Sequence, residues 1–419
     1  MKVLVVNAGS SSLKYQLIDT KTEEVMAKGI CEKIGLPGSL IDHKKHDGTK
    51  IKKEMAMPDH AVATEIVIDM LVDKTYGCIK SMDEIEAVGH RVVHGGPYFF
   101  ESCIVTPEVI ENIEKCIEFA PLHNPAHIMG IKGCLKVMPN VKQVVVFDTA
   151  FHQTMKEEAY TYPLPIKMVE EDHIRRYGAH GTSHRFVALE AIKLLGNKKD
   201  TKIVTCHIGN GSSISAVRDG KVLDTSMGFT PLDGVEMGTR CGSIDPAIVP
   251  YIMKKYNIGV DEITDFLNKK CGFLGVSDYS SDSRDIEAAI CHEYNDKLPN
   301  YPKTDKEKEI VTKHAKLAAD ILAFQVKKYI GSYSAVMNGL DCIVFTAGMG
   351  ENNPELRERV CRNMEYFGID IDYELNAKTL RQPNIVELST PKSKVKVYVL
   401  PTNEELMIAL DTEALVSKA

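Results

Sequence analysis

No apolar run in this sequence approaches the roughly 18 residues that a membrane-spanning helix needs. The N-terminus has only the short apolar stretch of residues 3–6 before polar residues begin, which is too short for a secretory signal. The eleven cysteines form no CxxC pair and no spacing typical of metal ligands, so they predict free thiols in a reducing compartment. We therefore expect a cytoplasmic protein without disulfides, zinc or a membrane anchor.

An excess of positive charge is also lacking, because 51 Lys and Arg stand against 58 Asp and Glu, for a formal charge of -7. This balance excludes an extended basic surface for nucleic acid or anionic membranes. The sequence contains neither GxxxxGK[ST] nor GxGxxG, so it supports neither a P-loop nor a dinucleotide-binding fold. A nucleotide site in this chain must be built in another way.

The chain has the size and composition of a folded protein of two domains: 419 residues, of which 44% are hydrophobic and 26% charged. Short β-rich runs alternate with amphipathic helical stretches, which predicts α/β architecture. The clearest strands are expected at 3–6, 144–147, 203–206 and 343–345, and the clearest helices at 108–119 and 313–329.

One internal similarity organises the sequence. Residues 3–15 and 203–217 each contain an apolar strand, a Gly-Ser-Ser turn and a second strand, and the two copies lie about half a chain apart. This pattern predicts a duplicated domain. We expect the strand at 395–400 and the helix at 404–416 to pack back on the first domain, giving domains of 1–150 plus about 390–419 and 151–389. The polar stretches 42–60 and 300–308 are expected to be solvated excursions.

Three Gly-rich segments, at 7–12, 207–212 and 348–352, follow apolar strands, and Lys14 lies close behind the first. Such segments expose backbone N–H groups with little side-chain bulk, which suits phosphate binding. A single one is most often an ordinary tight hairpin. Three together favour a nucleotide site, in which the glycines of the third would let a base or ribose approach the backbone.

Two arginines, Arg91 and Arg240, each lie between glycines, a setting that suits bidentate capture of a carboxylate or phosphate. Each could equally be an ordinary surface or ion-paired arginine.

His123 precedes a helix start at Asn124, where the helix dipole favours an anion. His123 and His127 have i, i+4 spacing, but the helix begins between them and no third ligand follows, so zinc is rejected.

Three further residues are candidates for catalysis or metal binding. His180 lies in a glycine-bracketed loop, although a lone histidine is more often structural. Asp148 follows the strand 144–147, at a strand end that suits a catalytic or metal-binding carboxylate, or a turn cap. Glu404 begins the last helix, where acidic residues commonly only favour the dipole. Asp148 and Glu404 together could supply the few carboxylates that Mg²⁺ needs, provided that the C-terminus folds back.

The segments 3–14 and 207–220 resemble the two sequence signatures of the acetate kinase family. The resemblance continues through His-Arg-Val-Val-His-Gly-Gly at 90–96, Pro-Leu-His-Asn-Pro at 121–125, Phe-Asp-Thr-Ala-Phe-His at 147–152 and Pro-Thr-Asn-Glu-Glu at 401–405. It covers essentially the whole chain. It implies the duplicated actin-like ATPase fold of acetate and sugar kinases, Hsp70 and actin, with the nucleotide in the interdomain cleft, and a homodimer.

The resemblance also implies a reaction: reversible, Mg²⁺-dependent, direct in-line phosphoryl transfer between ATP and acetate, giving ADP and acetyl phosphate, with Mn²⁺ as a substitute metal. The implied catalytic residues are Arg91, Asp148, His180, Arg240 and His123. Acetate would be bound by Arg91, Val93, Leu122 and Pro231, and the metal by Asn7, Asp148 and Glu404. The implied ATP-binding residues are Lys14, His207, Ile208, Gly209, Asn210, Gly211, Asp282, Ser283, Arg284, Gly348, Met349, Gly350, Glu351 and Asn352.

The chemistry fits these groups. Phosphoryl transfer depends on positioning and charge neutralisation more than on covalent help. Acetate is already ionised at neutral pH, since carboxylic acids have pKa values of about 4 to 5, so no general base is needed. We therefore assign Asp148 to metal binding and electrostatics.

Substrate selectivity is less constrained by the sequence, because Ala179 stands where many relatives of this family have Phe. The added space predicts a secondary activity on propionate, since one methylene is worth only about 1–3 kcal/mol of discrimination. A propionate or butyrate kinase is the nearest competing activity.

Three more distant activities each conflict with particular residues. A slow ATP-hydrolysing nucleotide switch would not need the carboxylate clamp of Arg91 and Arg240. A sugar kinase would need a larger polar pocket than Val93, Leu122 and Pro231 provide. A pyrophosphate-using enzyme would close the adenosine pocket, which Gly348 and Gly350 leave open.

Overall fold

The structure is a computed structural model that describes residues 1–418. The chain forms two compact units. Unit 1 comprises Met1–Gln153, Gly181–Ser183 and the chain from Asn403 onward, and unit 2 comprises Thr154–His180 and His184–Thr402. The chain therefore passes from one unit to the other several times, and its last helix belongs with its first strands.

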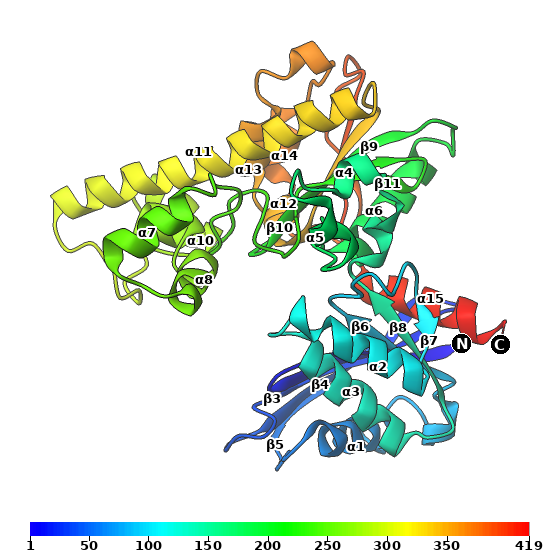
Figure 1. Cartoon of the computed structure of the whole chain (residues 1–419). Helices are drawn as coiled ribbons and strands as arrows, with labels where there is room; N and C mark the ends of the chain where they lie inside the picture. The colour runs from blue at the N-terminus through cyan, green and yellow to red at the C-terminus, as the bar shows by residue number, and fades with distance from the viewer. Residues whose placement is uncertain (419) are drawn as a thin grey trace. The chain divides into compact units, whose positions relative to one another are not determined.

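Unit 1 is built on a mixed sheet with the strand order β5-β4-β3-β2-β1-β6-β8-β7 (Figure 1). Strands β1, β6 and β8 are parallel to one another, and every other neighbouring pair is antiparallel. The strands are β1 (Lys2–Gly9), β2 (Ser12–Asp19), β3 (Glu24–Glu32), β4 (Leu40–Lys45), β5 (Lys50–Glu54), β6 (Ala87–Val92), β7 (Cys103–Ile104) and β8 (Lys142–Phe147).

Helices cover both faces of this sheet. Leu4, Val6 and Val88 join the buried cluster that includes α1 (His60–Val72) and α3 (Asn124–Val137). The opposite face meets α15 (Glu404–Val416), and a Cβ added to Gly89 would lie 2.5 Å from Thr412 Oγ1 on that helix. Helix α2 (Pro107–Lys115) packs on α3, and three 3-10 turns complete the unit: η1 (Met82–Glu84), η2 (Cys116–Glu118) and η3 (Ala150–Thr154).

Unit 2 is built on a second mixed sheet with the order β11-β10-β9-β12-β14-β13. Strands β9, β12 and β14 are parallel, and the remaining pairs are antiparallel. The strands are β9 (Lys202–Ile208), β10 (Ser212–Arg218), β11 (Lys221–Thr225), β12 (Cys342–Thr346), β13 (Val386–Glu387) and β14 (Lys396–Val399).

The helices of unit 2 also lie on both sides of its sheet. Val204, Cys206 and Phe345 belong to the large buried cluster that includes helix α11 (Asp305–Val336), which is 32 residues long and begins with a Thr304–Glu307 capping box. The other helices are α4 (Glu157–Tyr160), α5 (Ile166–Glu170), α6 (Gly181–Leu194), α7 (Ile248–Tyr256), α8 (Val260–Lys269), α9 (Gly272–Ser277), α10 (Ser283–Ile290), α12 (Ala347–Asn352), α13 (Pro354–Cys361), α14 (Tyr373–Lys378) and the 3-10 turn η4 (Glu365–Phe367).

The two sheets repeat one plan. In unit 1 the strands β3-β2-β1-β6-β8 follow the same order and directions as β11-β10-β9-β12-β14 in unit 2. Each copy opens with the antiparallel hairpin that carries the Gly-Ser turn. The predicted α/β class and the duplication are therefore confirmed, and this is the arrangement of an actin-like ATPase fold.

Three expectations about local structure were wrong. The polar stretch 42–60 contains most of β4 and all of β5, because the lysines of β5 suit an exposed sheet edge. The strand at 395–400 does not return to the first domain, since β14 is buried beside β12 in unit 2. The segment 348–352 is not a loop but part of the short helix α12, whose first residue, Ala347, has a left-handed φ of 65°.

Within residues 1–418, no helix is both long and apolar enough to cross a membrane. All eleven cysteines lie in this part of the chain and all carry free thiols, six of them buried.

Candidate active site

In unit 1, a bidentate ion pair joins the end of β6 to the end of β8. Arg91 donates from Nη2 to Asp148 Oδ2 at 2.5 Å and from Nε to Asp148 Oδ1 at 3.3 Å. The two strands are adjacent and parallel, with Arg91 aligned with Val146, so both side chains emerge at the same edge of the sheet. The predicted strand-end position of Asp148 is confirmed.

Glu404 brings a second carboxylate to Arg91. It begins α15 directly after the Asn403 cap, and its Oε2 lies 3.9 Å from Arg91 Nε. Burial raises the pKa of Glu404 to about 7, helped by the nearby negative charge of Asp148 and opposed by Arg91. For Arg91, burial would lower the pKa, but Asp148 and Glu404 outweigh it and raise the pKa. One guanidinium thus incompletely neutralises two carboxylates.

This arrangement fits a divalent cation. Mg²⁺ in a nucleotide site needs only one or two protein carboxylates, with water and phosphate oxygens completing its shell. Asn7 on β1 follows Val6, which pairs with His90, so Asn7 lies beside Arg91 in the sheet. Asn7 also lines a cavity of about 350 Å³ together with Lys14 and Glu405, but Asp148 and Glu404 are not among the residues that line this cavity. No cluster of three or more His, Cys, Asp or Glu that could hold a metal occurs within residues 1–418.

The other candidates of unit 1 lie on or near α3. His123 is itself the N-cap of α3 and is exposed, whereas the expected cap Asn124 is buried and donates from Nδ2 to His94 O at 2.9 Å. His127 is buried, and its pKa is lowered to about 3 because burial disfavours the charged ring. Val93 is 7% exposed, but Leu122 is 75% exposed.

In unit 2, His180 adopts the left-handed conformation with a φ of 60° at the N-cap of α6. Its Nδ1 lies 2.8 Å from Ser213 Oγ, and its ring stacks on His207 with 4.1 Å between the centroids. Ser213 Oγ also lies 2.7 Å from His184 Nε2. The β10 hydroxyl and the His207 ring therefore fix the orientation of His180.

Arg240 lies close to this histidine. A Cβ added to Gly211 would meet Arg240 Nη1 at 3.3 Å and His180 Nε2 at 3.6 Å. Arg240 donates from Nη1 to Pro231 O at 3.1 Å, with Met237 Sδ at 3.7 Å. No carboxylate of residues 1–418 lies within ion-pair distance of it, and burial alone lowers its pKa. Its charge is thus available to an anionic ligand.

Beside Arg240 is a small apolar cluster of Ala179, Met227 and Met237, all at most 4% exposed. The sequence pointed to Ala179 and Pro231, but gave no signal for the two methionines. A cationic side chain next to apolar walls is what a short carboxylic acid requires, since the carboxylate needs charge and the alkyl group needs apolar contact.

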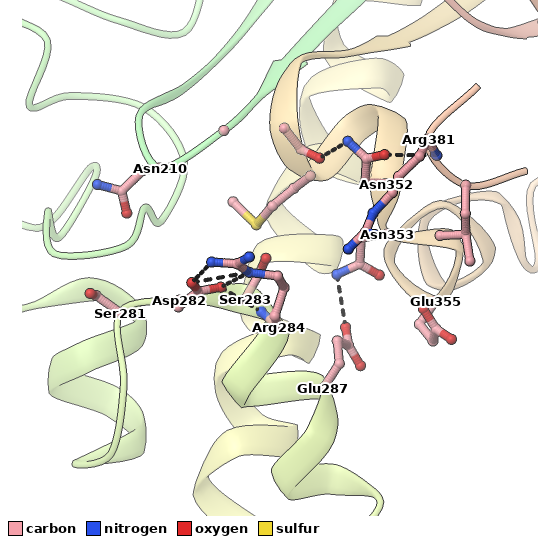
Figure 2. Close-up of a pocket in the computed structure, with 14 residues that line it drawn as sticks. Asn210, Ser281, Asp282, Ser283, Arg284, Glu287, Asn352, Asn353, Glu355 and Arg381 are labelled. Atoms are coloured by element: carbon pink, nitrogen blue, oxygen red, sulfur yellow. Dashed lines mark hydrogen bonds and ion pairs between the residues drawn. The ribbon is translucent and has the colours of Figure 1, made fainter. Parts of the chain in front are cut away.

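Unit 2 also contains a cavity of about 860 Å³ between β9, α10, α12 and α13 (Figure 2). Arg284 and Asp282 form a bidentate pair at its wall, and Asn353 Nδ2 donates to Glu287 Oε1 at 3.1 Å. The lining residues are Gly209, Asn210, Ser281, Asp282, Ser283, Arg284, Glu287, Gly348, Met349, Asn352, Asn353, Glu355, Leu380 and Arg381.

Eight of the fourteen expected nucleotide residues line this cavity: Gly209, Asn210, Asp282, Ser283, Arg284, Gly348, Met349 and Asn352. The others lie outside its wall. Glu351 Oε1 accepts from the N–H groups of Ala347 and Thr402, so this carboxylate holds the chain around α12. His207, Ile208, Gly211 and Gly350 lie in the adjoining segments, and Lys14 belongs to unit 1.

The sequence missed Leu380 and Arg381, which carry no motif and follow α14. It also missed Glu287, whose ion pair with Arg359 at 2.6 Å is a tertiary contact. On this side of the cavity the dipeptide Asn353-Pro354 is typical of a helix start, and Asn353 is the N-cap of α13.

Comparison with known proteins extends these observations. Residues 2–410 match the model of the acetokinase family. An acetate kinase from Desulfitobacterium hafniense is 52% identical over the full length of both chains. The solved acetate kinase of Porphyromonas gingivalis is 46% identical, with a TM-score of 0.91 and 99% of each chain covered. A solved propionate kinase from Francisella tularensis is 39% identical, with a TM-score of 0.86 and the same coverage.

The duplicated sheet and the charged site define a phosphotransferase of the actin-like ATPase class. The chain belongs to the acetokinase family.

Proposed function

We propose that this protein is an acetate kinase, which transfers a phosphoryl group reversibly between ATP and acetate and releases ADP and acetyl phosphate. The observation that carries the proposal is the position of Arg240, which has no carboxylate partner within residues 1–418 and lies beside His180 and the apolar cluster of Ala179, Met227 and Met237. This constellation suits a short carboxylic acid, and family membership supports the choice of acetate.

Charge neutralisation is the main task of the proposed catalytic residues. Arg91 and Arg240 bind the acetate carboxylate and the transferring phosphoryl group, and His180 donates to an equatorial phosphoryl oxygen. His180 is suited to this role because the contact of its Nδ1 with Ser213 fixes the ring beside Arg240. The exposed His123 at the N-terminus of α3 is proposed to contact phosphate.

Direct in-line transfer is proposed because acetate is already ionised at neutral pH, so its oxygen can attack the terminal phosphorus of ATP without a general base. Mg²⁺, or Mn²⁺ in its place, would neutralise charge on the phosphate oxygens of the nucleotide when bound. We assign its protein ligands to Asn7, Asp148 and Glu404. Asp148 therefore acts through charge, and its bidentate bond with Arg91 keeps that guanidinium oriented.

The nucleotide is proposed to occupy the cavity of about 860 Å³ in unit 2. Gly348 supports this, because a Cβ added there would meet nothing within 4 Å and the backbone is open to a ligand. Arg284 can cover a base or ribose, being 83% exposed at the cavity wall. Lys14, His207, Ile208, Gly209, Asn210, Gly211, Asp282, Ser283, Met349, Gly350, Glu351 and Asn352 remain proposed nucleotide residues, through direct contact or through the backbone that they shape.

Propionate is the proposed secondary substrate. Ala179 leaves more space than a Phe would, and the propionate kinase from Francisella tularensis has a similar structure. Val93, Leu122 and Pro231 are proposed to contact the substrate, although Leu122 would have to lose much of its exposure on binding.

We further propose that the protein is a cytoplasmic homodimer. The two compact units of each chain would be its two domains. Free thiols at all eleven cysteines suit a reducing compartment. An apolar patch on α7 and the start of α8 supports self-association: Ile248, Tyr251, Tyr256 and Val260 are 41%, 62%, 63% and 70% exposed.

The experiment that tests the function is the trapping of acyl phosphate as its hydroxamate, from ATP and Mg²⁺ with acetate, propionate, butyrate or no acid. Acetate-dependent trapping well above that with the longer acids is expected. Consumption of ATP at the same rate without any acid, with nothing trapped, would instead identify a nucleotide switch and remove the proposed roles of Arg91 and Arg240.

A further inference from the structure

Glu236 is a buried acid that none of the proposed steps uses. It lies between β11 and α7, four residues before Arg240. It is 2% exposed, and neither Oε1 nor Oε2 has a hydrogen-bond partner within residues 1–418. Buried polar groups are nearly always paired, and a buried charge without a partner is among the most costly features of a folded protein. The neutral, protonated form is therefore strongly favoured here.

The backbone of Glu236 links the Arg240 turn to the long helix α11. Its N–H donates to Gln325 Oε1 at 2.5 Å. One residue further on, Met237 N–H donates to Arg240 O at 3.2 Å, and Met237 O accepts from Phe273 N–H of α9 at 2.9 Å. The Met237 side chain then contacts Arg240 Nη1 through Sδ. The hydrogen bond from Glu236 N–H to Gln325 therefore attaches the turn that orients Arg240 to helix α11.

No charged group compensates Glu236. It forms no ion pair within residues 1–418, and burial is the single cause that raises its pKa, to about 8. The titratable groups on its own loop are Asp233, Arg240 and Cys241, and Cys271 lies at the start of α9. On α11, Gln325 is followed by Lys327, Lys328, Tyr329 and Tyr333, and the charges of Arg176 and Asp224 act on the two tyrosines.

We infer that Glu236 is a positioning residue whose neutral carboxyl keeps the Met237–Arg240 turn seated against α11, and whose ionisation loosens this turn. A carboxylate formed there must reach water or a cation. The nearest cation along its own loop is Arg240, which lacks a carboxylate partner. Whether the carboxylate turns to water or to Arg240, the Arg240 guanidinium moves from its position. The rate of phosphoryl transfer therefore declines as Glu236 loses its proton. This role rests on the proposed function of Arg240.

The test is the pH dependence of kcat for wild type and Glu236→Gln from pH 6 to 9.5. The amide has the shape of the protonated acid and cannot ionise. Wild-type kcat is expected to fall above about pH 8, approaching tenfold per pH unit as for a one-proton loss. Glu236→Gln should keep its pH 7 rate within about twofold across the range, with the KM for ATP unchanged. Glu358→Gln, which removes a surface carboxylate paired with Arg362, is the matched control and should follow wild type.

Two further measurements keep the inference open to refutation. Gln325→Leu removes the acceptor for the Glu236 N–H and should lower kcat without raising the KM for ATP. The wild-type Tm, which needs no variant, should fall as pH rises toward 8, because the folded state holds a proton that the unfolded state releases near pH 4.5. A Glu236→Gln profile that declines with the wild type, or a wild-type Tm insensitive to pH across this range, overturns the inference. Absence of acyl phosphate at every pH would instead overturn the proposed function, and the Tm would still report on the buried acid.

Discussion

At the scale of single residues, the two arginines of the site carry their charge in different surroundings. Arg91 is paired with Asp148, which is 1% exposed, so removal of Arg91 would leave a buried carboxylate uncompensated. Such a loss costs about 3–5 kcal/mol of stability and would confound a kinetic experiment. Within residues 1–418, the Arg240 guanidinium hydrogen-bonds to a carbonyl oxygen and a thioether and has no carboxylate partner. It therefore offers the cleaner test of charge stabilisation.

Arg240→Ala is expected to lower kcat by about 10²–10³, the effect of removing one positioned donor to a transition-state oxyanion. The Tm should change little, because no buried carboxylate is left behind. Steady-state kinetics with acetate and ATP measure this, with Arg218→Ala on the surface as control, since Arg218 pairs with the exposed Asp200. A wild-type kcat in Arg240→Ala would contradict the clamp.

Glu404→Gln is expected to raise the Mg²⁺ concentration for half-maximal activity by about tenfold or more, because one of two carboxylates at the proposed metal site is lost. The neighbouring Glu405→Gln is a matched control on the same first turn of α15. A Mg²⁺ titration at saturating ATP distinguishes the two. If both variants titrate like the wild type, Glu404 is not a metal ligand.

Ala179→Phe should favour acetate over propionate, because the added ring fills the space beside Met227 and Met237. A change of about tenfold in the ratio of the two kcat/KM values is expected, the amount that one methylene typically contributes. Competition between the two acids in the hydroxamate assay measures the ratio. An unchanged ratio would mean that residue 179 does not face the substrate.

Sequence reasoning located some of these residues for physical reasons and missed others. Asp148 and Glu404 follow from local rules, since one ends a strand and the other begins a helix. Glu236 and Met237 could not be found in this way, because burial and the absence of a partner depend on elements such as α11 that are distant in the sequence. Leu122 was expected at the substrate but is exposed, since a loop motif does not specify which side chains turn inward.

At the scale of elements, helix α13 stabilises the wall of the proposed nucleotide cavity through a fully buried arginine, Arg357. Arg357 donates to Gly350 O at 2.9 Å, to Asn376 Oδ1 at 2.8 Å and to Thr379 O at 2.7 Å. Burial lowers its pKa to about 10, so it remains charged at neutral pH. It joins α12 to α14 without any carboxylate.

Arg357→Leu is expected to destabilise the protein by about 3–5 kcal/mol, since several buried acceptors lose their donor. The KM for ATP should rise as the α12 backbone loosens. Denaturant unfolding and ATP kinetics provide the two readouts. The control is Arg362→Ala, which breaks a surface ion pair with Glu358 and should cost less than about 1 kcal/mol. Equal stability of both variants would show that Arg357 does not hold this wall.

The elements themselves were predictable where sequence and environment agree. Central strands such as β1 and β12 contain continuous apolar runs, at 3–6 and 342–345, and the helix expected at 313–329 lies within α11. The errors fall at edges. Strand β5 is polar because it is the exposed edge of its sheet, and β4 beside it buries only part of its residues, including Ile41 and His43. Strand β14 is too short for its sequence to reveal which sheet it joins. A strand of four residues carries too little sequence information to tell which of two similar sheets it will join.

At the scale of the whole molecule, self-association through the α7–α8 patch is expected. Tyr251→Glu combined with Tyr256→Glu should convert a dimer to a monomer, because two charges would enter an apolar interface. Light scattering after size-exclusion chromatography measures the mass. The control is Tyr366→Glu, which alters a tyrosine that is 95% exposed on η4. A wild-type mass in the double variant would place the interface elsewhere.

The return of α15 to the sheet of unit 1 has a consequence for synthesis on the ribosome. Strands β1, β6 and β8 emerge early, but the helix that covers one face of them is translated only after all of unit 2. At about 5–20 residues per second, this face waits tens of seconds for its cover. Unit 2 ends at Thr402 and is fully translated before unit 1. The half of the protein that is made first is therefore the half that matures last.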